Sequence, residues 1–254
     1  MIFVHFTIQN RQCYGIVEDD RIREIEGDFL SEYELTNIYH NMADIQFLPP
    51  VSPSKIVAIG LNYKHHAKEM ALPLPSEPLL FLKPPSAVIA HQQTIHHPAM
   101  SAQIDYEGEL ALVIGRQACR VAVEDAGHYI AGATICNDVT ARDIQTKDGQ
   151  WTRAKGFDTF APLGPWVANE LDYDNLAITT RLNGKTVQSS NTNDMIYGTA
   201  EIVSYVSHVM TLFPGDVIIT GTPSGIGPME DGDIVEIAIE GIGVLRNQYV
   251  KNIV

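Results

Sequence analysis

The sequence predicts a mainly β (α+β) protein whose short strands form an antiparallel or mixed architecture, closed or stacked, with few helices. Short apolar runs separated by glycine and proline carry this prediction. The expected strands are residues 56–59, 79–82, 110–114, 217–220 and the alternating segment 234–240. The clearest helix is predicted from about Thr199 to Leu212, where apolar residues recur on one helical face. A second, short helix is expected from Tyr63 to Met70, ahead of a proline-rich segment.

The N-terminal fifty residues are predicted to form a small unit of their own, a β-meander followed by a helix. Apolar residues alternate with a period of two in residues 2–8, and the pattern continues after them around a turn. Ser31 and Glu34 match a capping box, and the apolar residues that follow at helical spacing predict a short helix. The proline-rich stretch 48–54 is predicted to be a linker. The predicted units are therefore residues 1–50 and residues 54–254.

The composition is that of an ordinary globular protein and argues against a disordered or fibrous one. The 254 residues are 45% hydrophobic and 19% charged, with a mean hydropathy of -0.03. Seventeen basic and 31 acidic side chains give a formal net charge of -14. Because this charge repels phosphate backbones and anionic membrane surfaces, we expect neither nucleic acid nor a membrane as a partner.

Cysteine usage and the N-terminus favour a cytoplasmic location. Three cysteines lie far apart without a CxxC pair, which suits a reducing compartment better than a disulfide framework. No basic residue precedes the first apolar residues, and no small-residue cleavage site follows them. No run approaches the roughly 20 apolar residues that a spanning helix needs.

The sequence lacks the spacings of phosphate loops, dinucleotide-binding turns, serine nucleophile elbows and zinc sites. The first pattern that indicates chemistry is a pair of carboxylates. Glu107 and Glu109 stand two residues apart at the start of an apolar strand, so their side chains share one face. A metal ion and a solvated strand end explain this pair equally well. A third carboxylate, Asp138, follows the apolar run 130–136, although alone it equally suits a helix cap. Three oxygen ligands without cysteine would suit Mg²⁺ or Mn²⁺.

Two basic residues follow Asp138 and suggest substrate contacts. Arg142 would bind a substrate carboxylate as a fork, and Lys155 would stabilise an enolate or carry a proton. A salt bridge to a nearby acid is the stronger expectation for either residue in so acidic a chain.

Ordered motifs over most of the chain together resemble the fumarylacetoacetate hydrolase family. They are residues 60–69, 105–109, 137–143, 155–160 and 214–227, and the resemblance runs in order from about residue 54 to the C-terminus. It implies a mixed β-sandwich roll with a small N-terminal appendage, usually dimeric, with a Mg²⁺ or Mn²⁺ site in the catalytic domain 54–254. The chain is most similar to the 2-hydroxyhepta-2,4-diene-1,7-dioate isomerase / 5-carboxymethyl-2-oxohex-3-ene-1,7-dioate decarboxylase branch.

Two features favour that branch, and one segment departs from the family pattern. Leu61 stands where the acylpyruvate-cleaving branch tends to carry an arginine, and residues 157–160 look like the isomerase and decarboxylase branch. The segment 90–97 replaces a short Gly/Pro turn of relatives, so the shape of one loop beside the pocket does not follow from the resemblance.

The resemblance also assigns roles to individual residues. The metal carboxylates fall on Glu107, Glu109 and Asp138, the general-base dyad on His66 and Glu69, and the lysine near the metal on Lys155. The substrate-binding positions fall on Arg142, Gln145 and Thr222. The dyad agrees with the residue pattern, because positions i and i+3 share one face of a short helix. For Thr222, a role in the turn beside Gly221 and Pro223 remains an alternative.

These roles imply a divalent-metal-dependent enzyme that acts on a small 2-oxo dicarboxylate or its dienol, as in the catabolism of aromatic compounds. Isomerisation or decarboxylation would proceed through a metal-bound enolate. The alternative is a hydrolase that cleaves the C–C bond of an acylpyruvate or a fumarylacetoacetate-like diketo acid. A ligand-binding member without turnover is the third hypothesis. The expected partners are a small 2-oxo acid and a second copy of the chain in a homodimer.

Overall fold

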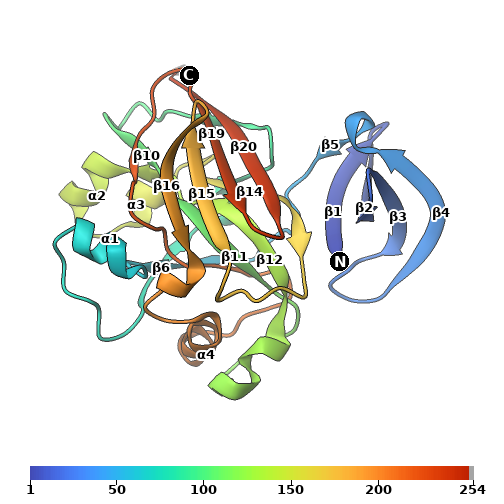
Figure 1. Ribbon diagram of the computed structural model, residues 1–254, viewed down its shortest axis with the longest axis horizontal. Coiled ribbons are helices and arrows are strands. Elements are labelled where there is room, and N and C mark those ends of the chain that lie inside the picture. The colour runs from blue at the N-terminus through green and yellow to red at the C-terminus, as the bar shows by residue number, and fades with distance from the viewer. Residues whose placement is uncertain (252–254) are drawn as a thin grey trace.

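Residues 1–251 are described by the computed structural model, and they form a mainly β architecture with few helices, as the sequence predicts (Figure 1). The largest sheet has twelve strands. Its ten-strand path runs in the order β4 (Tyr33–Asn41), β3 (Arg21–Gly27), β2 (Arg11–Glu18), β1 (Ile2–Ile8), β14 (Ala161–Ala168), β12 (Ile130–Asn137), β11 (Gly108–Ile114), β17 (Val217–Ile219), β6 (Ile56–Gly60) and β7 (Leu79–Lys83). The short strands β5 (Gln46–Phe47) and β8 (Val88–Ile89) pair with β1 and β14.

Two smaller sheets complete the fold. The first runs in the order β16 (Lys185–Asn191), β15 (Ala177–Leu182), β19 (Ile234–Ile239), β20 (Gly243–Val250) and β9 (Thr94–His96). The second contains β13 (Thr140–Ala141), β10 (Ile104–Tyr106) and β18 (Gly227–Pro228). Strands β11, β12 and β14 of the large sheet contact β15, β19 and β20, so the two larger sheets pack as a sandwich.

The helices are short and lie at the edges of the sheets. They are α1 (Lys64–Glu69), α2 (Arg142–Asp148), α3 (Thr152–Lys155) and α4 (Thr199–Val209), with the 3₁₀ turns η1 (Met42–Asp44), η2 (Pro85–Ala87), η3 (Val123–Tyr129) and η4 (Thr192–Asp194). The helices predicted near residues 63–70 and 199–212 are therefore confirmed as α1 and α4. In residues 1–251 no helix has both the length and the apolar character needed to cross a membrane.

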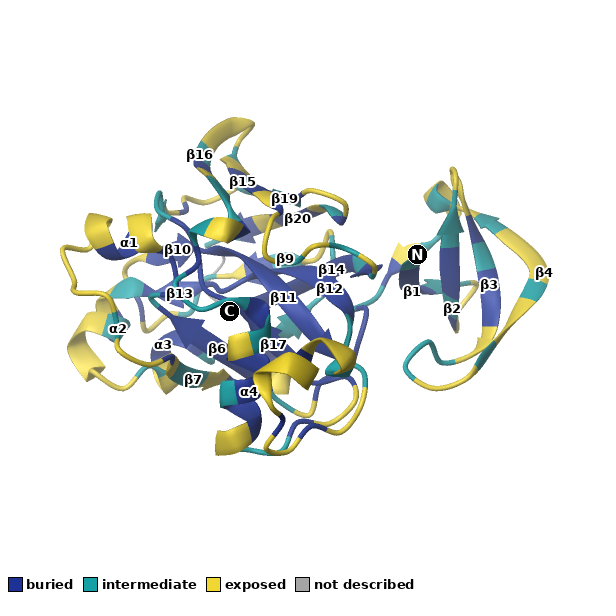
Figure 2. Ribbon diagram, turned by 60° about the horizontal axis from the view of Figure 1, so that its bottom comes forward, coloured by how far each residue is buried: buried dark blue, intermediate teal, exposed yellow. Residues whose placement is uncertain are grey.

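The central strands are buried on both faces, which explains their continuous apolar sequences. All seven residues of β11 and all five of β6 are buried (Figure 2). Along β11, Leu110 and Leu112 pack in the core toward the second sheet, whereas Ala111 and Val113 pack in a cluster on the opposite face. This covered strand gives the carboxylates at its start a rigid support.

The predicted helix after Ser31 is wrong, because residues 33–41 form strand β4. Asp28 makes the local turn instead: its carboxylate accepts a hydrogen bond from the Leu30 amide at 2.9 Å. Strand β4 then pairs antiparallel along the open edge of β3, and the Thr36 hydroxyl donates to the Glu24 carbonyl at 2.7 Å. The apolar residues at helical spacing remain exposed, so they do not form a buried helical stripe.

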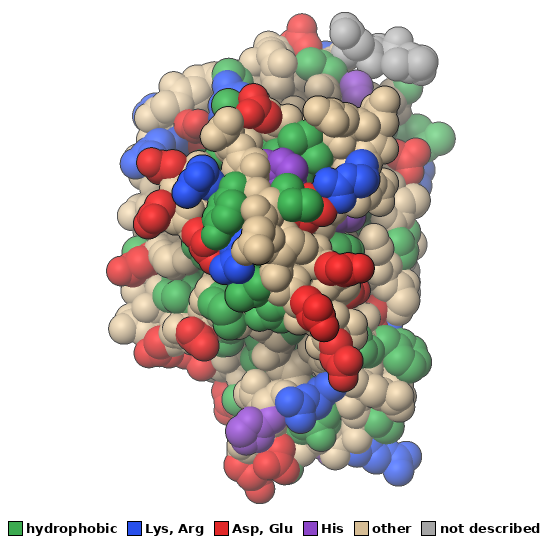
Figure 3. Space-filling model, turned by 90° about the vertical axis from the view of Figure 1, so that its right-hand side faces the viewer, with side chains coloured by type: hydrophobic (Ala, Val, Ile, Leu, Met, Phe, Trp, Pro, Cys, Tyr) green, Lys and Arg blue, Asp and Glu red, His purple; other side chains and the backbone are tan. Residues whose placement is uncertain are grey.

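The N-terminal strands join the main sheet through one antiparallel pair. Strand β1 pairs with β14, with Ile2 opposite Ala168 and Phe3 opposite Val167. In Figure 1 the blue N-terminal strands stand beside the main body, and Figure 3 shows the face that they present to solvent. Acidic, basic and hydrophobic side chains are interspersed there.

The segment that departs from the family pattern lies away from the pocket described below. Its residues 94–96 form β9, which pairs in parallel with β20. Within the described part of the chain, no residue of 90–97 lines that pocket.

Candidate metal and substrate site

Two neighbouring strands bring the three predicted metal carboxylates together. Strands β11 and β12 are antiparallel, with Gly108 opposite Asn137, so the start of one lies beside the end of the other. The Asp138 amide donates to the Glu107 carbonyl at 2.8 Å, and the Glu107 amide donates to the Asn137 side chain at 2.9 Å. The register of one strand pair therefore places Glu107, Glu109 and Asp138 at one point.

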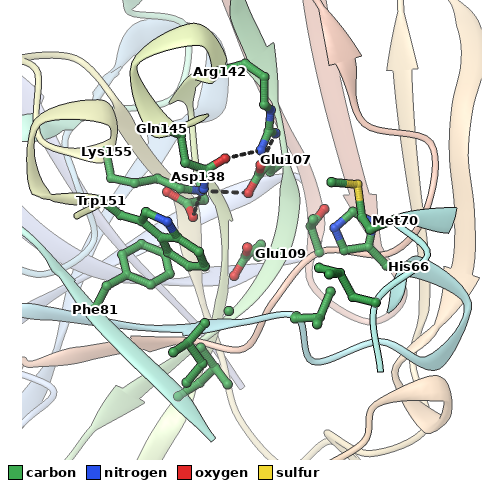
Figure 4. A pocket seen from close by; sticks show the side chains of 16 residues that line it. His66, Met70, Phe81, Glu107, Glu109, Asp138, Arg142, Gln145, Trp151 and Lys155 are labelled. Atoms are coloured by element: carbon green, nitrogen blue, oxygen red, sulfur yellow. Dashed lines mark hydrogen bonds and ion pairs between the residues drawn. The ribbon is translucent and has the colours of Figure 1, made fainter. Parts of the chain in front are cut away.

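The three side chains form a compact acidic cluster under the floor of a pocket (Figure 4). Each offers a carboxylate oxygen, and these atoms all lie within 4.8 Å of one another. Glu107, Glu109 and Asp138 are 5%, 2% and 1% exposed, so the solvated strand end is excluded as an explanation. The cavity measures about 160 Å³.

Two of the three carboxylates are neutralised by buried cations. The Lys155 ammonium group, on α3, lies 2.8 Å from Glu107 and 2.5 Å from Asp138. Arg142, at the start of α2, pairs with Glu107 and also with Asp105 at 2.8 Å. The salt bridges expected for both basic residues are therefore present, and they hold Arg142 and Lys155 at the pocket wall.

Glu109 has no such partner among the described residues and accepts a hydrogen bond from the Gly221 amide at 2.7 Å. Burial, together with the charges of Asp138 and Glu107, raises the pKa of Glu109 well above its usual range. For Glu107, Lys155 and Arg142 overcome the effect of burial and lower the pKa to about 2. The cluster thus keeps one carboxylate that forms no ion pair with any described side chain, and the charge of Lys155 only partly offsets the rise in its pKa.

The residues present fit a hard divalent cation. The donor set consists of carboxylate oxygens without sulfur, and the Glu109 carboxylate that lacks a counter-charge faces the cavity together with the other two (Figure 4). Mg²⁺ and Mn²⁺ prefer such oxygen ligands and commonly keep positions open for water or substrate.

The predicted dyad lies on the other side of the same pocket. On α1, the Nδ1 atom of His66 lies 2.9 Å from a carboxylate oxygen of Glu69. Glu69 in turn accepts a hydrogen bond from the Gly225 amide at 3.0 Å, which ties α1 to the loop after β17. His66 lines the cavity, and Figure 4 shows Glu109 between its ring and the side chains of Trp151 and Phe81. Glu69 does not line the cavity and contacts it through His66.

The remaining predicted residues also line the pocket. The Gln145 side-chain carbonyl accepts from Arg142, one turn earlier on α2. The Thr222 hydroxyl donates to the Gly108 carbonyl at 3.0 Å and accepts from Gln188 at 2.9 Å. The single proton of the Thr222 hydroxyl is therefore used within the protein, and only a lone pair remains for a ligand. A lone pair repels a substrate carboxylate, so these hydrogen bonds agree better with a structural role for Thr222.

Sequence reasoning missed a second buried lysine. The Lys83 ammonium group is completely buried, 2.6 Å from an Asp138 oxygen and 3.2 Å from the Val139 carbonyl. Burial lowers the pKa of Lys83, and the negative charge of Asp138 offsets only part of that effect. A lysine at the end of an apolar strand run was the available signal, but its partner lies 55 residues away in sequence.

The fold and this site define a class of protein: a mainly β sandwich with a buried carboxylate cluster, which could bind a metal ion, beside a histidine–glutamate dyad. Residues 55–250 match the family model described as fumarylacetoacetate (FAA) hydrolase C-terminal, and residues 1–50 match a model described as Rv2993c-like, N-terminal. The chain belongs to the fumarylacetoacetate hydrolase family, which confirms the resemblance seen in its motifs.

Three relatives illustrate the activities named in this family. The bovine (Bos taurus) mitochondrial oxaloacetate tautomerase FAHD2A is 42% identical over 221 residues, which cover 82% of this chain and 70% of the bovine protein. The crystal structure of 2-hydroxyhepta-2,4-diene-1,7-dioate isomerase from Mycobacterium marinum has a TM-score of 0.93 at 40% identity and covers 99% of each chain. The structure of fumarylpyruvate hydrolase from Pseudomonas aeruginosa, in complex with Mn²⁺ and pyruvate, has a TM-score of 0.75 at 33% identity and covers 82% of this chain and 92% of the hydrolase. These relatives are enzymes that are named for tautomerisation, isomerisation and hydrolysis.

Proposed function

We propose that this protein is a divalent-metal-dependent enzyme that isomerises or decarboxylates a small 2-oxo dicarboxylate or its dienol. One observation carries the proposal: the buried carboxylate cluster, with Glu109 lacking a counter-charge, faces the same cavity as the His66–Glu69 dyad. The relatives named as an isomerase and a tautomerase support this class of reaction.

Glu107, Glu109 and Asp138 would hold the ion, as Mg²⁺ or Mn²⁺. When bound, such an ion supplies Lewis-acid stabilisation of negative charge on the oxygens of a 2-oxo acid. Lys155 adds a fixed positive charge at the same wall, because its contacts with Glu107 and Asp138 hold its ammonium group there.

His66 is the group that would move protons. Glu69 holds its Nδ1 atom, and within residues 1–251 no protein group hydrogen-bonds Nε2. Nε2 would take the proton from the carbon beside the 2-oxo group, which breaks that C–H bond, and return it at another carbon or at oxygen. Glu69 stabilises the protonated ring in between. In decarboxylation the carbon–carboxylate bond breaks instead: CO₂ leaves, the electron pair of that bond remains on the substrate as an enolate, and the enolate then takes up a proton from water. No proton needs to be removed from carbon.

Arg142 and Gln145 would receive a substrate carboxylate. Their hydrogen bond to each other, and the contacts of Arg142 with Asp105 and Glu107, fix the guanidinium plane at the pocket wall. Thr222 would join them only if its hydroxyl released the Gly108 carbonyl, to which it donates at 3.0 Å, and donated to the substrate instead. These groups orient the substrate relative to His66.

Hydrolysis of an acylpyruvate or a fumarylacetoacetate-like diketo acid is the second candidate. The His66–Glu69 pair also suits activation of a water molecule, and the relative named fumarylpyruvate hydrolase supports this alternative.

We also propose that the active form is a cytoplasmic homodimer. Light scattering on the purified protein tests its oligomeric state.

The first experiment is a turnover assay by ultraviolet absorbance with added Mg²⁺ or Mn²⁺ and an EDTA control. The substrates are oxaloacetate, acetylpyruvate and 2-hydroxyhepta-2,4-dienedioate. Metal-dependent loss of one substrate supports the proposal and separates decarboxylase, hydrolase and isomerase. Absence of turnover without metal binding would favour a non-catalytic protein.

Replacing His66 separates the candidate reactions further. His66→Ala should lower the rates of isomerisation and hydrolysis about 10²–10⁴-fold, because both reactions need a positioned base. It should leave much of a decarboxylation, which needs no proton removed from carbon. Equal loss of decarboxylation and isomerisation in initial-rate measurements would contradict these separate roles.

A further inference from the structure

The pocket divides into a charged half and an apolar half. Among its described lining residues, only Arg142 and Lys155 carry a permanent positive charge, and both lie with the acidic cluster. The apolar wall contains Ile59, Leu61, Met70, Leu72, Leu79, Phe81 and Trp151. It meets the charged half at Phe81, where the Lys155 ammonium group lies 5.1 Å from the centroid of the ring. Figure 4 shows Arg142, Lys155, Glu107 and Asp138 in the upper part of the pocket, Phe81 and Trp151 on the left, and Met70 beside His66 on the right.

An aromatic pair makes the inner part of this wall rigid. The Phe81 and Trp151 rings lie 5.1 Å apart between centroids, at 74° to each other. Trp151 also lies close against Gly60, where an added β-carbon would come within 2.7 Å of the indole ring. The absence of a side chain at Gly60 thus sets the position of the indole ring.

The outer part of the wall consists of exposed aliphatic side chains. Met70, Leu72 and Leu79 are 43%, 50% and 46% exposed at the pocket. Leu79 lies two residues before Phe81 on β7, so both side chains share one face of that strand. Exposed apolar side chains that continue an apolar cavity mark a surface for an apolar group.

We propose that the far end of the substrate is uncharged and apolar, and that its charged groups are confined to the end beside the carboxylate cluster. The inference rests on the proposed function, because it places the 2-oxo acid group at that cluster. Oxaloacetate meets the second part of this condition, because both of its carboxylates lie beside the reacting carbons and it has no distal group to place against the apolar wall. A seven-carbon dienedioate does not, because its second carboxylate lies at the far end.

The physical basis is the difference in free energy between a methyl group and a carboxylate when each is moved from water to this wall. A methyl group placed against Leu72, Leu79 and Trp151 leaves water favourably. A carboxylate at the outer part of the wall, beside Met70, Leu72 and Leu79, loses hydration there. The two lining cations do not compensate this loss, because Arg142 and Lys155 pair with the acidic cluster and Lys155 also lies against the Phe81 ring, at the inner part of the wall. The wall therefore selects against a distal charge.

A matched pair of ligands tests the proposal directly. The 2,4-dioxoheptanoate and 2,4-dioxoheptanedioate ions share one diketo acid head and differ only in a methyl or a carboxylate group at C7. Binding in saturating Mg²⁺ is followed by stopped-flow quenching of Trp151, one of two tryptophans, with Trp151→Phe identifying its signal. We expect a dissociation constant at least about tenfold lower for the methyl compound.

Two lysine substitutions in one exposed loop provide the matched control. Leu72 lines the pocket, whereas Leu74 is similarly exposed, at 57%, and does not line it. Leu72→Lys should tighten the dicarboxylate about five- to tenfold by supplying a cation. Leu74→Lys should leave the preference unchanged. Both positions are at the surface, so neither variant disturbs the core.

The outcomes separate this inference from the proposed function. Equal or tighter binding of the dicarboxylate to the wild type, or failure of the methyl compound to bind, would overturn the inference. An equal shift in both lysine variants would also overturn it. Oxaloacetate turnover in the same preparation tests the proposed function: discrimination without turnover contradicts that function alone, and turnover without discrimination contradicts the inference alone.

Discussion

At the scale of single residues, Glu109 distinguishes this site from an ordinary buried salt-bridge network. Glu107 and Asp138 form ion pairs with Lys155, and Asp138 also pairs with Lys83. Among the described residues, Glu109 has one hydrogen-bond partner, the Gly221 amide. A buried acid without a counter-charge destabilises the fold when it ionises. A bound cation would supply the missing counter-charge, and the carboxylate cluster could hold one.

Glu109→Gln should therefore stabilise the metal-free protein and remove its response to metal. The pKa of Glu109 is raised in the folded state, so the folded state binds a proton that the unfolded state releases. The contribution of Glu109 to the stability of the folded state is fully present below pH 4.5, the usual pKa of a glutamate, and is lost as the pH rises toward the raised pKa of the folded state. In EDTA at pH 8 we expect the variant to gain about 1–3 kcal/mol over the wild type in urea unfolding.

The control for this substitution is the same comparison at pH 5, where the gain should be smaller. Isothermal titration with Mn²⁺ should show weakened or absent binding to the variant. A variant that is less stable than the wild type at every pH would show that Glu109 has its counter-charge within the protein.

The sequence predicted the acidic residues of the site better than its basic ones. The period of two on one strand put Glu107 and Glu109 on one face, and Asp138 followed an apolar run, but these local patterns left a solvated strand end and a helix cap open. The resemblance to the family supplied the assignment of all three as metal ligands. Lys83 reaches Asp138 from β7, and the packing of β7 against α3 is a long-range property. The salt bridges of Arg142 to Asp105 and Glu107 likewise depend on tertiary packing and not on a local pattern.

At the scale of elements, the N-terminal strands show how sheet pairing overrides a helical pattern. Glu24, on β3, accepts two hydrogen bonds from Arg11, on β2, at 2.6 and 2.8 Å. His40, on β4, lies 2.7 Å from the same carboxylate. This cluster connects three strands and requires residues 33–41 to be extended, which a capping-box pattern in the sequence does not reveal.

Glu24→Gln tests this connection through its pH dependence. Arg11, with a smaller contribution from His40, lowers the pKa of Glu24 to about 2 against burial. A lowered pKa stabilises the fold above the usual value of 4.5, and the contribution disappears as pH falls toward 2. We expect the wild type to be more stable than the variant at pH 7 and equally stable near pH 2, as measured by urea unfolding.

The expected difference at pH 7 is about 1–3 kcal/mol, the range for hydrogen bonds to a charged group. Glu26→Gln, at an exposed position on the same strand, is the control and should change stability by less than about 0.5 kcal/mol. A constant difference between Glu24→Gln and the wild type from pH 7 to pH 2 would show that ionisation of Glu24 plays no part.

At the scale of the whole molecule, the two units share one sheet and an aromatic contact. Strand β1 pairs with β14, and Phe47 of the N-terminal unit packs against Trp166 and His91 of the main body. The sequence predicted a proline-rich linker between units, but no local pattern could show that β1 continues the large sheet. Continuity of the sheet means that the units stabilise each other.

Metal binding should therefore stabilise the whole chain and not only the pocket. An ion at 100 times its dissociation constant adds about 2.7 kcal/mol to the stability of the folded state, which for a chain of this size raises Tm by roughly 5–10 °C. Because β1 and β14 are paired, we expect one transition that shifts as a unit, with EDTA reversing the shift. Scanning calorimetry measures the transition, and limited proteolysis at rising temperature follows the N-terminal strands separately. Proteolytic removal of residues 1–50 at the same temperature with and without metal would show that the β1–β14 pair does not couple the two units.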